Sequence, residues 1–276
     1  MNSSTYPPLS LLDDWAQPFF DVQSPYLKKW RYVYMVWLSC VLSLDVPGNI
    51  MVITSILTFK PLRQMSNMLV INLAMFDLGV MTMNLLAFLG GIFGKALFTP
   101  MFCEISGTVC MVSCFGSLWS IMAIALNRYL FICHNALYRS IFNWRTTLMY
   151  IFTIWVIVVC MDVPYMSYLG FGAHEFIPYN LHCAFPISDD WWYNVVVYTG
   201  VGFVLPCSIT AFCYFNIWKS ATKMSGKVSE QRRNEQRQMT KSLIIIFCVF
   251  VVTWFPSSML FAFSGVFSQI DIRFGI

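Results

Sequence analysis

Charged side chains inside apolar stretches are the residues of this chain most able to do chemistry. Arg128 stands near the end of a long apolar run, and Asp45, Asp77 and Asp162 lie inside three others. A charge at such a place is costly unless it faces a protein interior or a water-filled cavity, so each predicts a functional site. The alternative for Arg128 is a guanidinium that reaches the lipid headgroups from a helix end. No nucleophile has a matched base and no loop has a phosphate-cradling pattern, so we do not expect an enzyme.

Composition shows which elements must position these residues. The 276 residues are 58% hydrophobic and only 11% charged, whereas soluble domains carry roughly 25% charged residues. A helix crosses a bilayer with about 20 apolar residues. Six stretches of that kind are present, at residues 32–58, 68–92, 106–133, 146–168, 191–218 and 242–267. The sequence therefore predicts an all-α membrane protein, built as a transmembrane helical bundle.

Basic residues between the spans indicate the orientation of this bundle. The loops after the first and third spans hold two basic residues each, and loop 219–241 after the fifth span holds seven. The positive-inside rule places these loops in the cytoplasm and the N-terminus outside, in a multi-pass protein of the plasma membrane. A glycosylation acceptor at Asn2, in Asn2-Ser3-Ser4, lies on the same outer side.

The span limits divide the chain into three parts. We expect residues 1–31 to form an extracellular N-terminal tail, 32–267 to form the transmembrane bundle, and 268–276 to begin the third extracellular loop. Membrane lipids are the expected surroundings of the bundle, and no nucleic-acid partner is expected.

Two of the ten cysteines differ in location from the rest. Eight lie within the apolar spans, where a small soft core residue is the ordinary interpretation. Cys103 and Cys183 lie on the predicted extracellular side, in an oxidising compartment. We expect a disulfide between them that draws the loop after the fourth span across the mouth of the bundle. The alternatives are two free thiols or a bond to another chain.

A family resemblance follows from markers in all six spans. They are Gly48-Asn49, then Asn72-Leu73-Ala74-x-x-Asp77, then Cys103 with Asn127-Arg128-Tyr129, then Trp155, then Pro206 with Tyr214, and finally Phe250-x-x-x-Trp254-x-Pro256. With these spacings, the chain over about residues 32–267 resembles the rhodopsin-like class of G-protein-coupled receptors. The segment 127–134 is similar to the melatonin-receptor-like branch and to invertebrate orphan receptors near it.

The resemblance implies a receptor mechanism. An extracellular or membrane-derived agonist, whether small molecule, lipid or peptide, contacts helices three, five and six, and helix six then moves outward to admit a heterotrimeric G protein. The implied coupling switch consists of Asn127, Arg128, Tyr129 and Tyr214. The implied activation switch consists of Pro206, Phe250, Trp254 and Pro256. The expected ligand pocket consists of Cys110, Met111, Cys114, Asp162, Tyr198, Gly202, Trp254, Ser258 and Phe261.

Three polar residues at similar depth in the spans predict a cation site. Asp77 lies mid-membrane, and Asn49 and Ser117 could supply further oxygen ligands. An ionised carboxylate there needs a cation or dense hydrogen bonding, and an allosteric sodium ion suits such ligands. The alternative is a protonated Asp77 held by the same neighbours. No other cofactor is expected, and the histidines are too dispersed along the chain for a metal centre.

The chain departs from the family pattern at two informative places. Asn127 replaces the usual Asp before the arginine, so it can hydrogen-bond the guanidinium but cannot neutralise it. Cys110, eighteen residues before Arg128, stands where receptors for biogenic amines place an Asp. A simple cationic amine is therefore disfavoured as the ligand.

The seventh helix, with its Asn-Pro-x-x-Tyr motif, is not found before Ile276. We therefore expect six spans of seven, in a fragment or a truncated isoform. A light-sensing opsin is the alternative function, because its retinal-linking Lys would belong to that helix. A six-span transporter or channel is less favoured, because the intramembrane acids occupy different helices and no internal repeat is found. The sequence following Ile276 would separate these cases.

Overall fold

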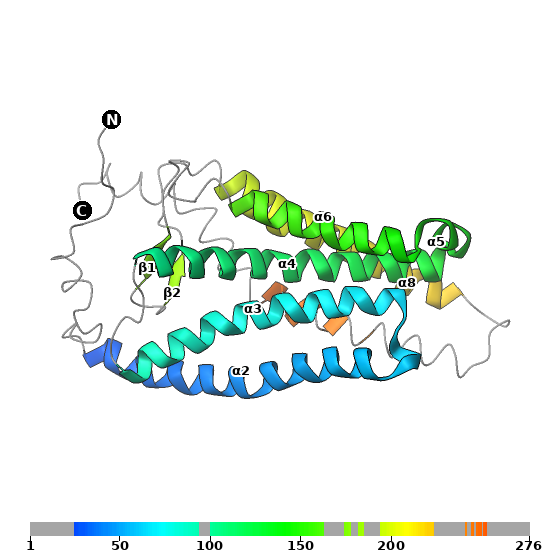
Figure 1. The fold of residues 1–276 in the computed structure, drawn as a ribbon. Helices are drawn as coiled ribbons and strands as arrows, with labels where there is room; N and C mark the ends of the chain where they lie inside the picture. The colour runs from blue at the N-terminus through cyan, green and yellow to red at the C-terminus, as the bar shows by residue number, and fades with distance from the viewer. Residues whose placement is uncertain are drawn as a thin grey trace. The chain divides into compact units, whose positions relative to one another are not determined.

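The structure is a computed structural model that describes residues 25–93, 100–162, 174–177, 182–184 and 194–223, with a few positions between 241 and 252. Within these residues the chain is almost wholly helical (Figure 1). Most of the predicted sixth span lies outside the described residues. The same is true of the predicted functional residues Asn2, Phe250, Trp254, Pro256, Ser258 and Phe261.

Five helices of the described part are long and apolar enough to cross a membrane. They are α2 (Pro25–Thr58), α3 (Met65–Phe93), α4 (Pro100–Cys133), α6 (Trp144–Asp162), and the continuous pair η4 (Asn194–Val204) and α8 (Leu205–Lys223). Each of the first five predicted spans falls on one of them, so the expectation of a helical membrane protein is confirmed. The shorter elements are η2 (Lys60–Leu62), α5 (Asn135–Ile141), β1 (Glu175–Ile177) and β2 (His182–Ala184).

The start of α6 shows how local sequence sets a helix boundary. The Asn143 side-chain oxygen accepts a hydrogen bond from the Thr146 backbone N–H at 3.1 Å. In return, the Asn143 backbone N–H donates to the Thr146 hydroxyl oxygen at 3.0 Å. This reciprocal arrangement satisfies N–H groups that the first turn of a helix leaves without intrahelical acceptors. It sets the start of α6 at the residue after Asn143.

Pro206 marks a change of helix type in the fifth span. η4 is a wide π-helix that ends at Val204, and α8 continues from Leu205 as an ordinary α-helix. A proline has no N–H to donate, and its ring crowds the carbonyl one turn earlier, so the preceding turns must change their geometry. Pro206 therefore gives a physical reason for the change of helix type just before it.

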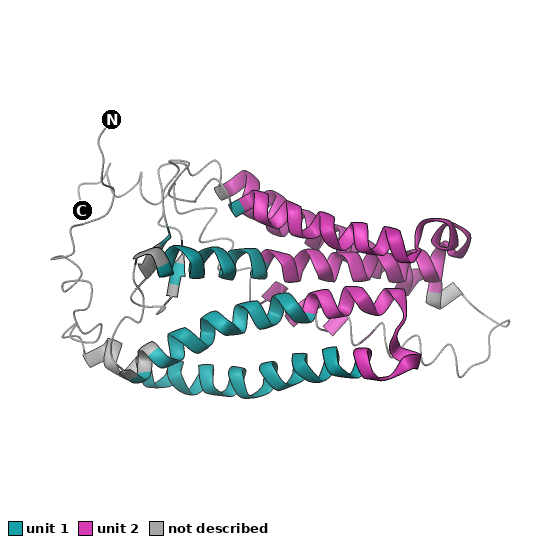
Figure 2. Cartoon of the chain, viewed as in Figure 1, with its two compact units in different colours: residues 1–55, 74–114, 162–186 teal, residues 56–73, 115–161, 187–276 magenta. Residues whose placement is uncertain are grey.

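The chain forms two compact units, which Figure 2 colours separately. Unit 1 comprises residues 1–55, 74–114 and 162–186, and unit 2 comprises 56–73, 115–161 and 187–276. The core of unit 1 includes Met83 packed with the two cysteines Cys103 and Cys183. In this unit Gly79 of α3 lies directly against Ser113 of α4, and a side chain at this glycine would overlap the serine. Small residues of this kind let membrane helices approach closely.

The core of unit 2 lies where α4 and α8 meet. Its buried members are Ala125 of α4 together with Cys213, Tyr214 and Ile217 of α8. Several partly buried side chains pack around them, including Tyr129. This core contains two of the predicted coupling residues, so the fold of unit 2 itself positions them.

Candidate ligand and coupling sites

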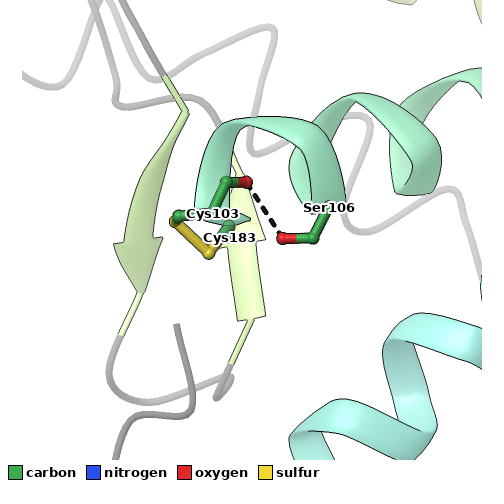
Figure 3. The surroundings of a disulfide bond; sticks show 3 residues. All are labelled: Cys103, Ser106 and Cys183. Carbon is green, nitrogen blue, oxygen red and sulfur yellow. Dashed lines mark hydrogen bonds between the residues drawn. A yellow bond between two sulfur atoms is a disulfide. The ribbon is translucent and has the colours of Figure 1, made fainter. Parts of the chain in front are cut away.

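A disulfide joins Cys103, in the first turn of α4, to Cys183 of strand β2 (Figure 3). Their Cα atoms are 5.4 Å apart, the two residues are 80 positions apart in sequence, and both are fully buried. The Ser106 hydroxyl donates a 3.0 Å hydrogen bond to the Cys103 carbonyl within the same helix. The predicted disulfide is confirmed, and it anchors the segment after α6 to the beginning of α4.

Strand pairing extends this anchor to a neighbouring residue. β1 and β2 are antiparallel, with Phe176 opposite Cys183 in the register. His174 immediately precedes β1, so the disulfide and the strand pair together hold His174 near α4. Sequence reasoning treated the histidines only as a dispersed set, and no local signal identified this one.

His174 meets one of the predicted pocket residues. Its Nε2 lies 3.5 Å from the carboxylate Oδ1 of Asp162, the last residue of α6. The side chains are 0% and 3% exposed, so this contact is inside the protein. The imidazole lies against Gly107 of α4, where a Cβ would overlap the ring. Because Gly107 has no side chain, the histidine can occupy this position.

Cysteines of α4 lie beside this acidic residue. The Cys110 and Cys114 thiols, one helical turn apart, interact with each other, and Cys110 is within electrostatic range of the Asp162 carboxylate. Met111 on the same stretch is buried as well. Within unit 1 the structure therefore places Cys110 near Asp162, two predicted pocket residues that are distant in sequence.

The other predicted pocket residues of the described part belong to unit 2. The Tyr198 ring of η4 stacks on Phe115 of α4 with centroids 5.2 Å apart. Gly202, one turn later, is closely packed, because a Cβ there would lie 2.6 Å from Phe115 and 2.8 Å from Met161. Sequence reasoning named Tyr198 and Gly202 but missed Phe115, which nothing in the local sequence distinguishes from other apolar residues.

Among the predicted cation ligands, Asn49 has a hydrogen-bond partner that the sequence analysis did not name. The Asn49 amide nitrogen donates to Asp45 of its own helix, to the carboxylate Oδ1 at 2.9 Å and to the carbonyl at 3.1 Å. Asp77 is half-buried and interacts electrostatically with Cys114. Ser117 is buried in the other unit. No group of three or more His, Cys, Asp or Glu able to hold a metal occurs among the described residues.

A buried hydrogen-bond chain links three helices of unit 2. The Asn72 amide of α3 donates to the Ser120 hydroxyl of α4 at 2.8 Å, and Ser120 donates to the Gly116 carbonyl at 2.7 Å. The Trp155 indole N–H of α6 donates to the Asn72 amide oxygen at 2.9 Å. Asn72 and Trp155 served the sequence analysis only as family markers. The structure shows that they are directly bonded partners and adds Ser120 as the second partner of Asn72.

The predicted coupling residues gather at the end of α4. Tyr214 is buried, and its hydroxyl lies within electrostatic range of the Arg128 guanidinium. Asn127 is 3% exposed, and its amide nitrogen has no hydrogen-bond partner in the described part of the chain. The Tyr129 hydroxyl lies 3.0 Å from Nε2 of His134, at the start of the short helix α5. The Arg128 guanidinium therefore follows the buried Asn127 amide in α4 and has tyrosine side chains nearby.

Apolar helices of spanning length and a disulfide that anchors the segment after α6 are the features that the sequence led us to expect. Residues 48–272 match the family described as 7 transmembrane receptor (rhodopsin family). The chain belongs to this family of receptors, whose members are not enzymes.

Individual relatives are similar over about three quarters of the chain. The chain is 32% identical over 217 residues to melatonin receptor type 1C of Gallus gallus, a match that covers 77% of the chain and 62% of that receptor. It is 32% identical over 219 residues to melatonin receptor type 1C of Xenopus laevis, covering 77% and 51%. It is 28% identical over 217 residues to melatonin receptor type 1A of Ovis aries, covering 77% and 58%. The matched region spans between half and two thirds of these relatives.

Proposed function

We propose that this protein is a G-protein-coupled receptor of the plasma membrane, with an extracellular N-terminus, that binds a small ligand from outside. Binding shifts a helical bundle toward a state in which the sixth span moves outward and a heterotrimeric G protein docks. The observation that carries the proposal is the proximity of Arg128, near the end of α4 that is predicted to be cytoplasmic, to the buried Tyr214 of α8. Family membership supports it independently.

The Arg128 group has the features of a two-state element. An arginine guanidinium has five donors in a fixed fork, so it can exchange one set of acceptors for another. Tyr214 offers a hydroxyl oxygen nearby, on a different helix. The buried amide nitrogen of Asn127 lacks an acceptor in the described part, which makes the present arrangement easier to rearrange. A ligand changes the populations of the two states by its different affinity for each.

The proposed ligand is a small uncharged aromatic molecule. The relatives at 28–32% identity are named melatonin receptors, and melatonin is therefore the first compound to test. Cys110 and Met111 of α4 provide soft apolar surface next to one buried acid, Asp162. A mostly apolar wall with few polar groups is the usual composition of a small-molecule site. The sodium site stays a prediction, and no step of this mechanism requires it.

The experiment uses the complete receptor, expressed in cells that carry reporters of G-protein dissociation. We expect melatonin to produce a response in darkness, and Arg128→Ala to abolish it while surface expression stays within about twofold of the unmodified receptor. Arg145→Ala, at an exposed arginine at the start of α6, is the matched control and should signal normally. An unchanged response in Arg128→Ala would contradict the proposed switch. A response that requires light would favour the opsin alternative.

A further inference from the structure

We propose that the Asp162 carboxylate, in contact with His174, is the polar anchor for an uncharged ligand that offers an N–H or O–H donor. This inference rests on the proposed function, because it names the ligand class for the same receptor. The residues that carry it, Asp162, His174, Gly107 and Cys110, all belong to unit 1.

The buried position of Asp162 requires a partner for its carboxylate. Asp162 is 2% exposed, and an isolated carboxylate at such a place is strongly disfavoured. The His174 Nε2, at 3.5 Å from Oδ1, is within ion-pair distance, and its own side chain is fully buried. Removing one member of a buried pair leaves the other uncompensated, which is why such pairs persist together. His174 is thus the internal partner that allows an acid at the end of α6.

The carboxylate oxygens of Asp162 can accept hydrogen bonds from a ligand. The 3.5 Å separation is longer than an ordinary hydrogen bond. Neither carboxylate oxygen of Asp162 accepts a hydrogen bond within the described ranges. An ionised carboxylate has about four acceptor sites, and buried polar groups in proteins are nearly always bonded. Among the described residues, Asp162 therefore has a neighbour at ion-pair distance but no hydrogen-bond donor, and a donor from a bound molecule would use this acceptor capacity.

Several parts of unit 1 hold His174 in position. Gly107 leaves room for the imidazole against α4, and any side chain at that position would overlap the ring. The disulfide between Cys103 and Cys183 and the pairing of β1 with β2 hold the segment that begins at His174. The histidine is therefore positioned before any ligand binds, and preorganisation of this kind lowers the entropic cost of binding.

The contact between Asp162 and His174 disfavours cationic ligands. Asp162 lies within electrostatic range of Cys110, so its carboxylate approaches the part of α4 where an amine receptor would have its own acid. A cationic ligand that approached this carboxylate would have to compete with His174, which already lies 3.5 Å from Oδ1. An uncharged donor meets no such competition. His174 therefore makes the site select against cationic ligands.

The test measures thermal unfolding of the complete purified receptor with three probes at equal concentration. N-acetyltryptamine is uncharged and has two N–H groups, its dimethylated derivative has both capped, and tryptamine is a cation. We expect N-acetyltryptamine to stabilise the unmodified receptor most. His174→Gln removes the imidazole partner of Asp162 and should raise the affinity ratio of tryptamine to N-acetyltryptamine about tenfold or more. Asp162→Leu should remove the preference for N-acetyltryptamine over its capped derivative.

Gly107→Ala displaces the ring without changing either charged residue, so it should move the ratio in the same direction as His174→Gln. If His174→Gln does not fold, Gly107→Ala still tests the role of the imidazole. Gly48→Ala is the matched control, because a Cβ there meets nothing within 4 Å. The proposal is overturned if millimolar N-acetyltryptamine does not stabilise the unmodified receptor, or if tryptamine does so equally. An unchanged ratio in both variants also overturns it. Intact probe selectivity without G-protein activation would count against the proposed function alone.

Discussion

The indole N–H of Trp155 donates a 2.9 Å hydrogen bond to the amide oxygen of Asn72, which lies 83 residues earlier in the chain. The amide nitrogen of the same Asn72 donates to Ser120, so one side chain of α3 bonds to both α4 and α6. Asn72 is 3% exposed, and a buried amide of this kind needs its partners. This chain of bonds sets the relative register of three helices in unit 2.

Trp155→Phe should destabilise the receptor. The change removes the donor and leaves the Asn72 oxygen without this bond, at a cost of about 1–3 kcal/mol. Thermal unfolding of the purified protein measures the effect. Trp144→Phe is the control, because Trp144 lies at the start of the same helix and is 51% exposed. Equal unfolding temperatures for the two variants would mean that the bond to Asn72 contributes nothing.

Cys103→Ala should lower surface expression and stability. Removing a native disulfide costs about 2–5 kcal/mol in small domains, because the bond restricts the unfolded chain and holds its segments together. Cell-surface labelling and peptide mapping under non-reducing conditions provide the measurements. Cys160→Ala, at an exposed free cysteine of α6, should behave like the unmodified protein. Free thiols at both Cys103 and Cys183 in folded protein would contradict the structure.

Gly202→Ala should strain the fifth span. The added methyl group would lie 2.6 Å from Phe115 and 2.8 Å from Met161, and such overpacking costs about 1–3 kcal/mol. A lower unfolding temperature and, if Tyr198 contacts the ligand, weaker binding are expected. Gly200→Ala is the control on the same helix, because its Cβ would approach only a backbone oxygen, at 3.5 Å. The prediction fails if the two alanine variants unfold alike.

Asn127→Asp should lower ligand-independent signalling. An aspartate beside Arg128 would add an ion pair to the inactive state, and partly buried opposite charges attract more strongly than exposed ones. The reduction should be modest, because Asn127 is 3% exposed and burying a charge carries a desolvation cost. Basal G-protein activation is compared at matched surface expression. Equal or higher basal activity in the Asp variant would show that another contact holds the inactive state.

The sequence by itself determined the class of this protein, a helical membrane protein, and its first five spans. A span depends on a run of consecutive apolar residues, which is local information, so the limits of α2 at Thr58 and of α4 at Cys133 agree with the predicted ones. The disulfide was predictable for a similar reason, because only Cys103 and Cys183 lie outside the apolar runs. Family spacing also pointed to Arg128 and Tyr214, which the structure places near each other.

Only the tertiary structure decided which polar side chains meet. The amide nitrogen of Asn49 bonds to Asp45, one turn earlier in α2, a partner that the sequence analysis did not name. The contact of His174 with Asp162 depends on the disulfide, the strand register and the absence of a side chain at Gly107. Such contacts join residues that are distant in sequence, and their strength depends on distance, direction and burial. None of these three quantities can be read from residue types along a chain.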